Sequence, residues 1–393
     1  MCNAKCVIYN WQSMKELGNP FTVYNFATDD YFCSRQAEQE QLLSALRNGR
    51  NVTLMSERRM GKTGLIINMF EQLKKEKNAP VCIYADIFST KSLNDFVQIL
   101  ARQILGRFDS PIEKALATLA NFFKNSRVYM ATDPLTGEPQ IGLDFQAKEA
   151  KHTLLEIFSY LRSLGKEFYL AIDEFQQIAA YADSGIEALL REQMQFTKNV
   201  RFIFSGSKQH LMNEIFTSPN RPFYRSTDKI QLFAIPKDTY RQFAQKFFTK
   251  AKRSLSNEVF DEIYDRFEGH TWYMQYILNR LWESGKQKIE QQDIQTALLD
   301  ILAAEDENFR NIYDNLTENQ CMLLRAIASE GIVEKVNASE FIKKYDLGIP
   351  SSVNRALHNL IDRELVLKMP NGYRVYDRFM AIWLKRLFVV NIR

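Results

Sequence analysis

The stretch at residues 54–70, "LMSERRMGKTGLIINMF", constrains the fold more than any other part of this chain of 393 residues. A short apolar run leads into it, and after Gly61, Lys62 and Thr63 the apolar residues recur at helical spacing. A strand, a loop ending in Gly-Lys-Thr and a helix are typical of the phosphate-binding loop, the Walker A pattern. In that loop, backbone N–H groups and the lysine bind phosphate oxygens, and the hydroxyl serves a Mg²⁺ ion. We therefore expect nucleotide phosphates to bind where the helix begins.

The first position of the loop departs from this pattern, because Ser56 stands where a glycine is usual. If the residue must adopt a left-handed conformation, serine costs about 1 kcal/mol more than glycine. Such strain weakens the loop but leaves its phosphate ligands in place. The alternative is a chance strand, turn and helix with a solvated lysine. The residues that we expect to contact the nucleotide here are Ser56, Arg58, Arg59, Met60, Gly61, Lys62, Thr63 and Gly64.

A pair of acidic residues, Asp173 and Glu174, follows the apolar run in "KEFYLAIDEF" and matches the Walker B pattern. An aspartate at the carboxyl end of a buried strand can hold Mg²⁺ together with Thr63. The adjacent glutamate can polarise the water that attacks the γ-phosphate. The alternative is a strand that ends in a solvated acidic turn, and the phosphate loop upstream favours the catalytic interpretation.

Small polar residues end another apolar run, "NVRFIFSGSKQHLM". If this strand lies between the strands of the two motifs above, the hydroxyl of Ser207 would face the γ-phosphate, the place called sensor 1 in such ATPases. The alternative is a turn of small residues that lets the strand meet the next helix.

Strand-like runs alternate with helical patterns through the first 235 residues. This alternation predicts an α/β fold, in which helices cover both faces of a parallel sheet and the ligand binds at the carboxyl edge. The segment "ATDPLTGEPQIGLDF" carries turn residues between two short extended pieces and predicts an inserted hairpin.

The last part of the chain has a different pattern. Residues 236–315 are helical throughout and predict a helical lid, whereas residues 316–393 predict three short helices, a hairpin turning at Asn371-Gly372 and a final helix. That order is typical of a winged helix. We expect four parts: an N-terminal extension at 1–18, a P-loop ATPase domain at 19–235, the lid at 236–315 and the winged-helix domain at 316–393.

The recognition segment of the expected winged helix, "PSSVNRALHNLIDREL", has few cations. We expect its polar side to carry Ser352, Asn354, Arg355, Asn359 and Arg363, and its buried side to carry Val353, Leu357, Leu360 and Ile361. Two arginines beside two acids make a weak DNA reader, because a DNA-binding protein neutralises about six to ten phosphates.

Composition excludes several classes of protein. The net charge is only +4, and hydrophobic residues make up 46% of the chain, as in an ordinary globular protein. The five cysteines have neither C-x-x-C pairs nor zinc spacing, and their odd number argues against a secreted disulfide framework. With no run of 18 apolar residues and no signal peptide, we expect a cytoplasmic protein that does not engage a membrane.

The motifs together resemble the P-loop ATPases of the STAND and AAA+ type, in particular the archaeal-type ATPase family. The resemblance runs from Asn19 to the end, through "NPF", "FCSRQAEQEQLLSAL", "SERRMGKT", "LAIDEF", "FSGSKQHLM", "PFYRST", "GHTWYMQYILNRLW" and "VYDRFMAIWLKR". It implies a five-stranded parallel sheet of order 5-1-4-3-2, with a helical lid and a C-terminal winged-helix domain.

The resemblance also implies roles for residues. The segment from Phe32 to Arg35 would lie against the adenine, and Lys62, Thr63, Asp173 and Glu174 would carry out the phosphate and Mg²⁺ chemistry. Arg221 or, by preference, Arg225 would sense the γ-phosphate. Three places depart from the family pattern: Ser56, "PFYRST" without a glycine after the tyrosine, and Gly269-His270-Thr271 where a proline is expected third.

These features predict an ATP-binding protein, a Mg²⁺-dependent ATPase that acts as a nucleotide-controlled intracellular switch. One alternative is a scaffold that binds ATP or ADP without hydrolysis, and another is an ATP-dependent DNA-binding regulator or transposition helper. The partners that the sequence leaves open are a protein, DNA and further copies of the chain.

Overall fold

The computed structural model describes residues 18–24, 29–33, 35–105, 119, 122–123, 126–132, 139–182 and 185–389. The chain divides into two compact units. The first comprises residues 1–243 with His270–Trp272, and the second comprises residues 244–269 and 273–393. All of the expected N-terminal extension except Gly18 lies outside the described residues.

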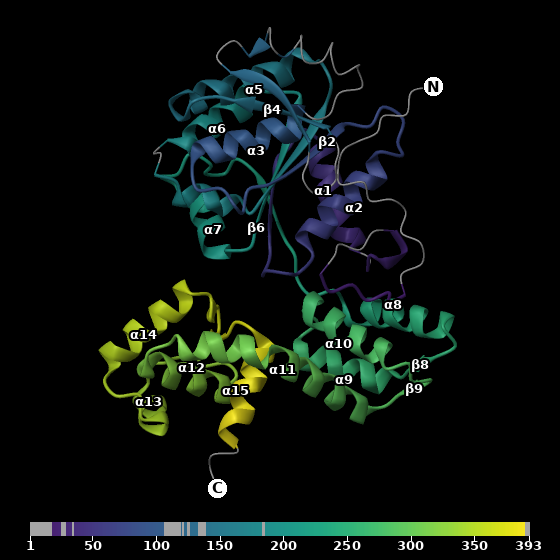
Figure 1. Cartoon of the computed structure of the whole chain (residues 1–393), viewed down its shortest axis with the longest axis vertical. Helices are drawn as coiled ribbons and strands as arrows, with labels where there is room; N and C mark the ends of the chain where they lie inside the picture. The colour runs from purple at the N-terminus through teal and green to yellow at the C-terminus, as the bar shows by residue number, and fades with distance from the viewer. Residues whose placement is uncertain are drawn as a thin grey trace. The chain divides into compact units, whose positions relative to one another are not determined.

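A five-stranded sheet organises the first unit (Figure 1). Its strands are β1 (Val52–Met55), β2 (Val81–Asp86), β5 (Phe168–Asp173), β6 (Val200–Gly206) and β7 (Asp228–Gln231). They pair in the order β2-β5-β6-β1-β7, and every pair is parallel. Numbered along the chain and read from the β7 edge, this is the predicted order 5-1-4-3-2.

Helices cover both faces of this sheet, as predicted. They are α1 (Gln36–Arg47), α2 (Lys62–Leu73), α3 (Leu93–Leu105), α5 (Ala150–Ser163), α6 (Ile186–Phe196) and α7 (Gln209–Thr217). Figure 1 shows α1 and α2 on one side of the sheet and the other four on the opposite side. Short 3₁₀ helices occur at Asp29–Tyr31, Ala147–Glu149 and Phe175–Ala180.

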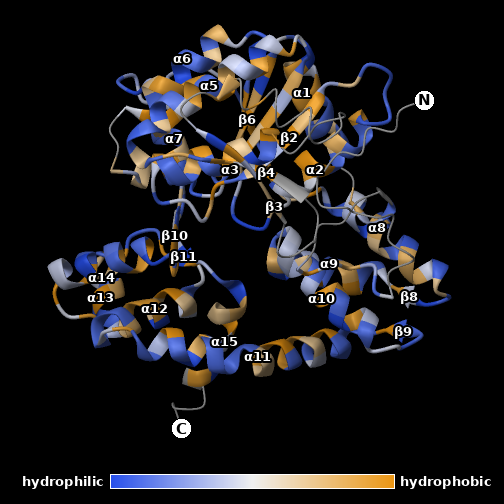
Figure 2. Cartoon of the chain, turned by 45° about the horizontal axis from the view of Figure 1, so that its top comes forward, coloured by the Kyte–Doolittle hydropathy of each residue, from blue (hydrophilic) through white to orange (hydrophobic). Residues whose placement is uncertain are grey.

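The interior strand β5 contributes side chains to two separate hydrophobic cores. Tyr169 and Ala171 join the cluster beneath α1 and α2, whereas Leu170 and Ile172 join the cluster beneath α3, α5, α6 and α7. This alternation follows from the two-residue period of a strand. Figure 2 shows the strands around β2 and β6 as mainly hydrophobic, while the surrounding helices carry both kinds of residue. The strands therefore lie in an apolar interior, and polar side chains gather at their carboxyl ends.

The predicted hairpin is present. Strands β3 (Arg127–Thr132) and β4 (Pro139–Asp144) form an antiparallel pair of their own, inserted between α3 and α5. Residues 133–138, which connect them, lie outside the described residues.

The second unit begins within α8 (Lys237–Lys250) and is mainly helical. Helices α9 (Asn257–Phe267), α10 (Thr271–Glu283) and α11 (Gln291–Asp314) come next, with a short parallel pair, β8 (Ser254–Leu255) and β9 (Lys288–Ile289). The Ser256 hydroxyl caps α9 by accepting a hydrogen bond from the Val259 N–H at 3.3 Å.

The C-terminal part has the elements predicted for a winged helix. They are α12 (Glu318–Glu330), α13 (Ser339–Tyr345), α14 (Pro350–Asp362), the antiparallel strands β10 (Val366–Met369) and β11 (Gly372–Val375), and α15 (Arg378–Val389). Gly372 has a φ of 138°, and a Cβ there would lie 2.5 Å from the Val333 carbonyl, so the hairpin requires glycine at this point.

One expectation about α14 was wrong in detail. Val353, Leu357 and Leu360 are buried as expected, but Ile361 is only half-buried, because it lies at the edge of the apolar stripe next to the last turn. The domain boundaries expected at residues 235 and 315 stay a prediction. Among the described residues, no helix has both the length and the apolar character needed to cross a membrane.

Candidate nucleotide-binding site

The loop between β1 and α2 has its strained residues at its far end. Gly61 precedes α2 with a φ of 96°, and Arg59 has a φ of 63°. Ser56 is not among the residues with positive φ, although it is fully buried. The left-handed conformation considered for Ser56 is therefore taken by Arg59 and Gly61, and the serine bears no such strain.

Lys62 is a buried cation, only 5% exposed. Its Nζ donates to Ser56 Oγ at 3.2 Å and to the Glu57 carbonyl at 3.3 Å. Burial lowers the pKa of the Lys62 ammonium, and the nearby charges of Asp173 and Glu174 oppose this effect. Because its hydrogen-bond acceptors are uncharged, this ammonium is suited to an added anion such as a phosphate.

Asp173 and Thr63, the pair expected at the metal, lie together. The Thr63 hydroxyl donates to Asp173 Oδ2 at 2.7 Å, and the Glu174 N–H donates to Asp173 Oδ1 at 3.0 Å. A third donor, the phenol of Tyr84 on β2, reaches Asp173 Oδ2 at 2.7 Å. Asp173 is 3% exposed, and these three donors compensate its carboxylate for the loss of water.

Glu174 also has a defined arrangement. Its φ is 55°, and its Oε2 accepts hydrogen bonds from Ser207 Oγ at 2.9 Å and from Gln176 Nε2. A Cβ on Gly206 would meet the side chains of Gln176 and Met212, so a larger residue there would displace the glutamine that holds Glu174. Ser207 reaches Glu174 because β6 lies between β1 and β5, which is the place predicted for this strand.

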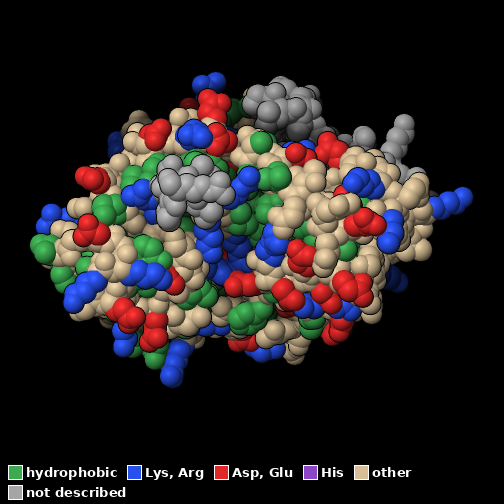
Figure 3. Space-filling model, turned by 90° about the horizontal axis from the view of Figure 1, so that it is seen from below, with side chains coloured by type: hydrophobic (Ala, Val, Ile, Leu, Met, Phe, Trp, Pro, Cys, Tyr) green, Lys and Arg blue, Asp and Glu red, His purple; other side chains and the backbone are tan. Residues whose placement is uncertain are grey.

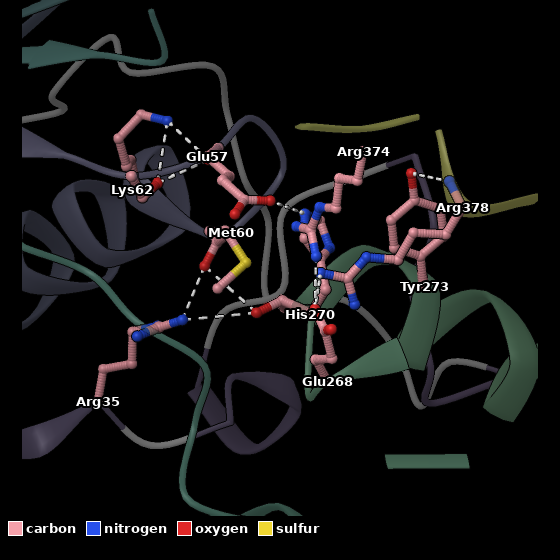
Figure 4. Close-up of polar contacts among 11 residues, drawn as sticks. Arg35, Glu57, Met60, Lys62, Glu268, His270, Tyr273, Arg374 and Arg378 are labelled. Atoms are coloured by element: carbon pink, nitrogen blue, oxygen red, sulfur yellow. Dashed lines mark hydrogen bonds and ion pairs between the residues drawn. The ribbon is translucent and has the colours of Figure 1, made fainter. Parts of the chain in front are cut away.

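Arg35, expected near the nucleotide, is bonded to protein oxygens, and its contact with the nucleotide stays a prediction. It is 3% exposed, and its guanidinium donates to the carbonyl of Met60 at 2.8 Å and to that of Phe233 at 3.0 Å. It also pairs with Glu38 at 2.9 Å. In Figure 4 the side chain points at the Met60 carbonyl of the phosphate loop. Arg35 therefore supports the loop through protein oxygens.

Three consecutive residues at the start of α10 contact the same loop. His270 Nε2 lies 3.9 Å from Glu57 Oε2, Thr271 Oγ1 donates to the Met60 carbonyl at 3.3 Å, and the Arg59 guanidinium lies 4.2 Å from the centre of the Trp272 ring. Thr271 stands where a proline was expected. Its hydroxyl makes a hydrogen bond to the loop that proline cannot make.

The remaining loop residues differ in exposure. Arg58 is exposed, with its guanidinium 5.8 Å from the centre of the Phe88 ring. Gly64 is buried, and a Cβ there would lie 3.3 Å from the Phe32 ring. Phe32, expected against the adenine, thus packs against the first turn of α2, and a larger residue at 64 would press on it.

The two arginines considered for the γ-phosphate differ. Arg221 forms ion pairs with Glu187 at 2.6 Å and with Glu214 at 3.5 Å. Arg225 is exposed, with a φ of 51°, and its guanidinium lies 5.2 Å from the centre of the Tyr224 ring. Because two carboxylates already hold Arg221, the preference for Arg225 stands as a prediction.

The sequence did not point to two residues of this site, Tyr84 and Gln176. Tyr84 is aligned with Ala171 across the β2–β5 pair, two residues before Asp173, so its direction depended on a register that the sequence does not give. Gln176 depends on the positive φ of Glu174, which turns the chain back. A signal existed for the first of them, since a polar ring near the end of a strand beside the Asp173 strand can reach the carboxyl edge.

The donor set fits Mg²⁺. This ion is usually held by one or two carboxylates together with phosphate oxygens and water, rather than by a cage of protein ligands. Thr63 supplies a hydroxyl and Asp173 a carboxylate, and the described residues contain no cluster of three or more His, Cys, Asp or Glu side chains able to hold a metal alone. An ion bound here would depend on the nucleotide.

A parallel sheet of this order with a Gly-Lys-Thr loop at its carboxyl edge defines the class of P-loop nucleoside triphosphatases. Residues 32–277 match the family described as the ATPase domain predominantly from Archaea, and residues 307–386 match a probable winged helix domain. The chain belongs to this archaeal-type ATPase family, which confirms the resemblance seen in its motifs.

Solved structures agree with this fold. The Walker-type ATPase PABY2304 of Pyrococcus abyssi aligns with a TM-score of 0.64 and 18% identity, over 93% of this chain and 99% of its own. The Aeropyrum pernix ORC2 protein, solved in ADPNP–ADP complexes, aligns with a TM-score of 0.56 and 16% identity, over 95% of this chain and 98% of its own. Comparison with curated protein sequences gives no significant match.

Proposed function

We propose that this protein binds ATP with Mg²⁺ at the carboxyl edge of its sheet, hydrolyses it to ADP and phosphate, and uses the cycle to control its winged helix. The observation that carries the proposal is the placement of Glu174. Its carboxylate is held by Ser207 and Gln176, directly beside the Asp173–Thr63 pair. A bare phosphate-binding scaffold has no need of such a base.

Binding falls to the loop. Lys62 would bind the β- and γ-phosphates, exchanging its contacts with Ser56 and Glu57 for charged oxygens. Gly61 gives the loop the left-handed turn that lets backbone N–H groups converge. Thr63 and Asp173 would hold Mg²⁺, which supplies positive charge against the phosphates when bound.

Hydrolysis falls to Glu174. Its carboxylate accepts hydrogen bonds from two neutral donors and remains an acceptor, so it can orient a water and take its proton as the oxygen attacks the γ-phosphorus. The water oxygen bonds to phosphorus, the bond to the leaving ADP oxygen breaks, and the products are ADP and phosphate. Ser207 would lie beside the γ-phosphate, and Arg225 would supply a cation to it.

The control of the winged helix rests on the short stretch Glu268–Tyr273. Its middle residues, His270–Trp272, contact the phosphate loop within the first unit. Its outer residues contact the winged helix within the second unit, through the ion pairs of Glu268. Because these residues are consecutive, a movement of His270–Trp272 with the phosphate loop would shift Glu268 and Tyr273 as well.

The contacts on the winged-helix side are specific. Glu268 Oε2 pairs with Arg374 at 2.6 Å and with Arg378 at 2.9 Å, and the Arg378 N–H donates to Tyr273 Oη at 3.1 Å (Figure 4). Gly269 has a φ of 65°, and a Cβ there would lie 2.4 Å from the ring of Tyr264. The turn between the two sets of contacts therefore requires glycine at this position.

Replacement of Glu174 by glutamine tests the proposal. The shape of the side chain is kept while the base is removed, so we expect ATP affinity near that of the wild type and hydrolysis reduced by a factor on the order of 10². Calorimetry measures the first quantity and phosphate release the second. Glu192→Gln, at an exposed site on α6, is the matched control. Wild-type turnover in Glu174→Gln would contradict the assignment, and a wild-type protein without hydrolysis would favour the scaffold.

A DNA-binding regulator is less well supported. On α14 the side chains of Asn359 and His358 bond to carbonyls of their own helix, and Arg363 donates to the Asn315 carbonyl at 3.0 Å. The face in Figure 3 carries acidic and basic side chains intermixed. A DNA site needs a concentration of cations to neutralise phosphates, so we expect the winged helix to act on a protein partner.

A further inference from the structure

Tyr84 has no role in the chemistry proposed above, yet its phenol is bonded to the carboxylate at the centre of it. The hydroxyl donates to Asp173 Oδ2 at 2.7 Å, the same oxygen that accepts the Thr63 hydroxyl at 2.7 Å. The two donors come from different elements, β2 and α2. Asp173 Oδ2 is therefore held between the phosphate loop and the neighbouring strand.

The phenol of Tyr84 is a stable hydrogen-bond donor to Asp173. Burial, together with the adjacent Asp173 carboxylate, raises the pKa of Tyr84 well above its usual range. Even the ordinary pKa of a tyrosine is about 10, so at neutral pH the hydroxyl carries the proton that it donates to Asp173 Oδ2. The ring is also anchored, because Tyr84 packs against the cluster beneath α1 and α2.

The surroundings of Asp173 make a neutral donor useful. Asp86 ends β2 and is aligned with Asp173 in the sheet, and Glu174 follows directly. Burial raises the pKa of Asp86, and the charges of Asp173 and Glu174 add to the effect. Three carboxyl groups gathered at one edge repel one another, and a carboxylate without a fixed donor would rotate away from such neighbours.

We propose that Tyr84 is a positioning residue for the metal carboxylate, whose phenol keeps Asp173 turned toward Thr63 so that Mg²⁺ and ATP bind together. The proposal rests on the Mg²⁺-dependent ATP binding proposed above. It assigns to β2 a residue of the site that neither the phosphate loop nor the acidic motif contains. Partners that orient a metal ligand in this way commonly affect metal affinity about 10- to 100-fold.

We expect Tyr84→Phe to weaken the coupling between Mg²⁺ binding and ATP binding. Without Mg²⁺ the phosphates depend on Lys62 and the loop, so Tyr84→Phe should bind ATP as the wild type does. With Mg²⁺ the wild type gains affinity, and in Tyr84→Phe this gain should be about tenfold smaller. The ratio of the two affinities measures the coupling between ion and nucleotide, and it is independent of turnover.

Tyr181→Phe is the matched control. Tyr181 is a buried tyrosine of the same unit whose phenol is paired with Thr90 instead of Asp173. Its loss removes one buried hydrogen bond without touching the carboxylate. Asp173→Asn is the positive reference, and it should lose most of the gain that Mg²⁺ gives.

The experiment is a calorimetric titration of each full-length protein with ATP, once in EDTA and once in excess Mg²⁺, with melting curves as a check on folding. We expect an unchanged affinity in EDTA and a reduced Mg²⁺ gain for Tyr84→Phe alone among the two tyrosine variants. A full Mg²⁺ gain in Tyr84→Phe overturns the proposal, and so does an equal loss of affinity in EDTA and in Mg²⁺, which indicates a purely structural role. A wild type that binds no ATP, or gains nothing from Mg²⁺, overturns the proposed function itself and this inference with it.

Discussion

The phosphate loop edge and the recognition helix α14 both carry charged side chains, but they hold them in opposite ways. Lys62 and Asp173 are 5% and 3% exposed, and each is bonded to other side chains of the site. Arg355 on α14 and Arg363 directly after it are exposed. The first pair is kept inside the fold, and the second lies in solvent.

The difference shows which charged side chains indicate a binding site. Removing a charged group from water costs several kcal/mol unless it is paired. The hydrogen-bond acceptors of Lys62 are neutral and the charges of Asp173 and Glu174 offset its burial only in part, so an anionic ligand would complete the compensation. A solvated arginine costs almost nothing and needs no such explanation. The loop edge can therefore be interpreted as a binding site from its energetics, and α14 cannot.

Lys62→Ala removes the buried cation of the phosphate loop and should have the largest effect of the variants considered. We expect ATP affinity to fall at least about a hundredfold, because the loop loses its buried cation for the β- and γ-phosphates. Burial lowers the pKa of Lys62, which means that the fold bears a cost for this charge and does not need it for stability. Calorimetry measures binding and circular dichroism checks the fold.

The counterpart on α14 is Arg355→Ala, which should leave both ATP affinity and melting temperature unchanged. Unaltered ATP affinity in Lys62→Ala would remove the loop from the binding site. A loss in Arg355→Ala as large as that in Lys62→Ala would mean that exposed charges of α14 matter equally, and the contrast between the two regions would disappear.

Glu268→Gln should have the next largest effect, on communication rather than on binding. The ion pairs with Arg374 and Arg378 are lost, so the nucleotide-dependent change in hydrogen exchange of α12–α15 should shrink about fivefold while ATP hydrolysis persists. Glu262→Gln, which removes the ion pair with Arg266 on α9, is the control and should respond like the wild type. An undiminished response in Glu268→Gln would refute this route.

Ser56→Gly tests a buried polar group that we expect to matter little. The serine hydroxyl accepts from Lys62 at 3.2 Å and donates to the Glu57 carbonyl at 2.7 Å, contacts that are internal to the loop. Backbone N–H groups and Lys62 supply the phosphate ligands, so ATP affinity should stay within about threefold of the wild type. A loss of tenfold or more, with the fold intact, would make Ser56 a ligand.

Asp86→Asn should produce the smallest effect, on stability. Burial raises the pKa of Asp86 above its ordinary value of 3.8, so the folded state binds more protons than the unfolded state in that range and the free energy of unfolding falls as pH rises through it. Asparagine can still accept the Phe88 N–H, which lies 2.8 Å from Asp86 Oδ1. The variant should match the wild type at pH 3 and be more stable at pH 7. The difference should be no more than about 0.5 kcal/mol, because Asp86 lies at an exposed strand end where solvent screens much of the effect of its partial burial. Denaturant melts at the two pH values measure this, and a variant less stable at pH 7 would contradict the sign.

The sheet could be predicted from the sequence because distinctive residues stand at the ends of its strands. The loop after β1, Asp173 at the end of β5 and Ser207 after β6 belong at one edge, and parallel strands with these endings have few arrangements. Tyr84 was not predicted: its place near the end of β2 was a signal, but the direction of its side chain depends on how β2 aligns with β5. The nucleotide contact of Arg35 was expected from resemblance and stays a prediction, whereas its bonds to the carbonyls of Met60 and Phe233 could be seen only in the folded chain.

The chain leaves the first unit, returns to it for three residues and leaves it again, and this affects which fragments of the protein can be studied alone. Residues 270–272 belong with the first unit although residues 244–269 before them belong with the second. A fragment that stops at residue 243 would retain the whole sheet and the whole phosphate loop, yet it would lack His270–Trp272 and expose the ring-facing side of Arg59. A fragment extended to residue 277, where the family match ends, restores these contacts but carries α9 and half of α10 without the helices beyond them. The first unit of this chain is therefore discontinuous in sequence, and neither fragment is a faithful substitute for the full chain.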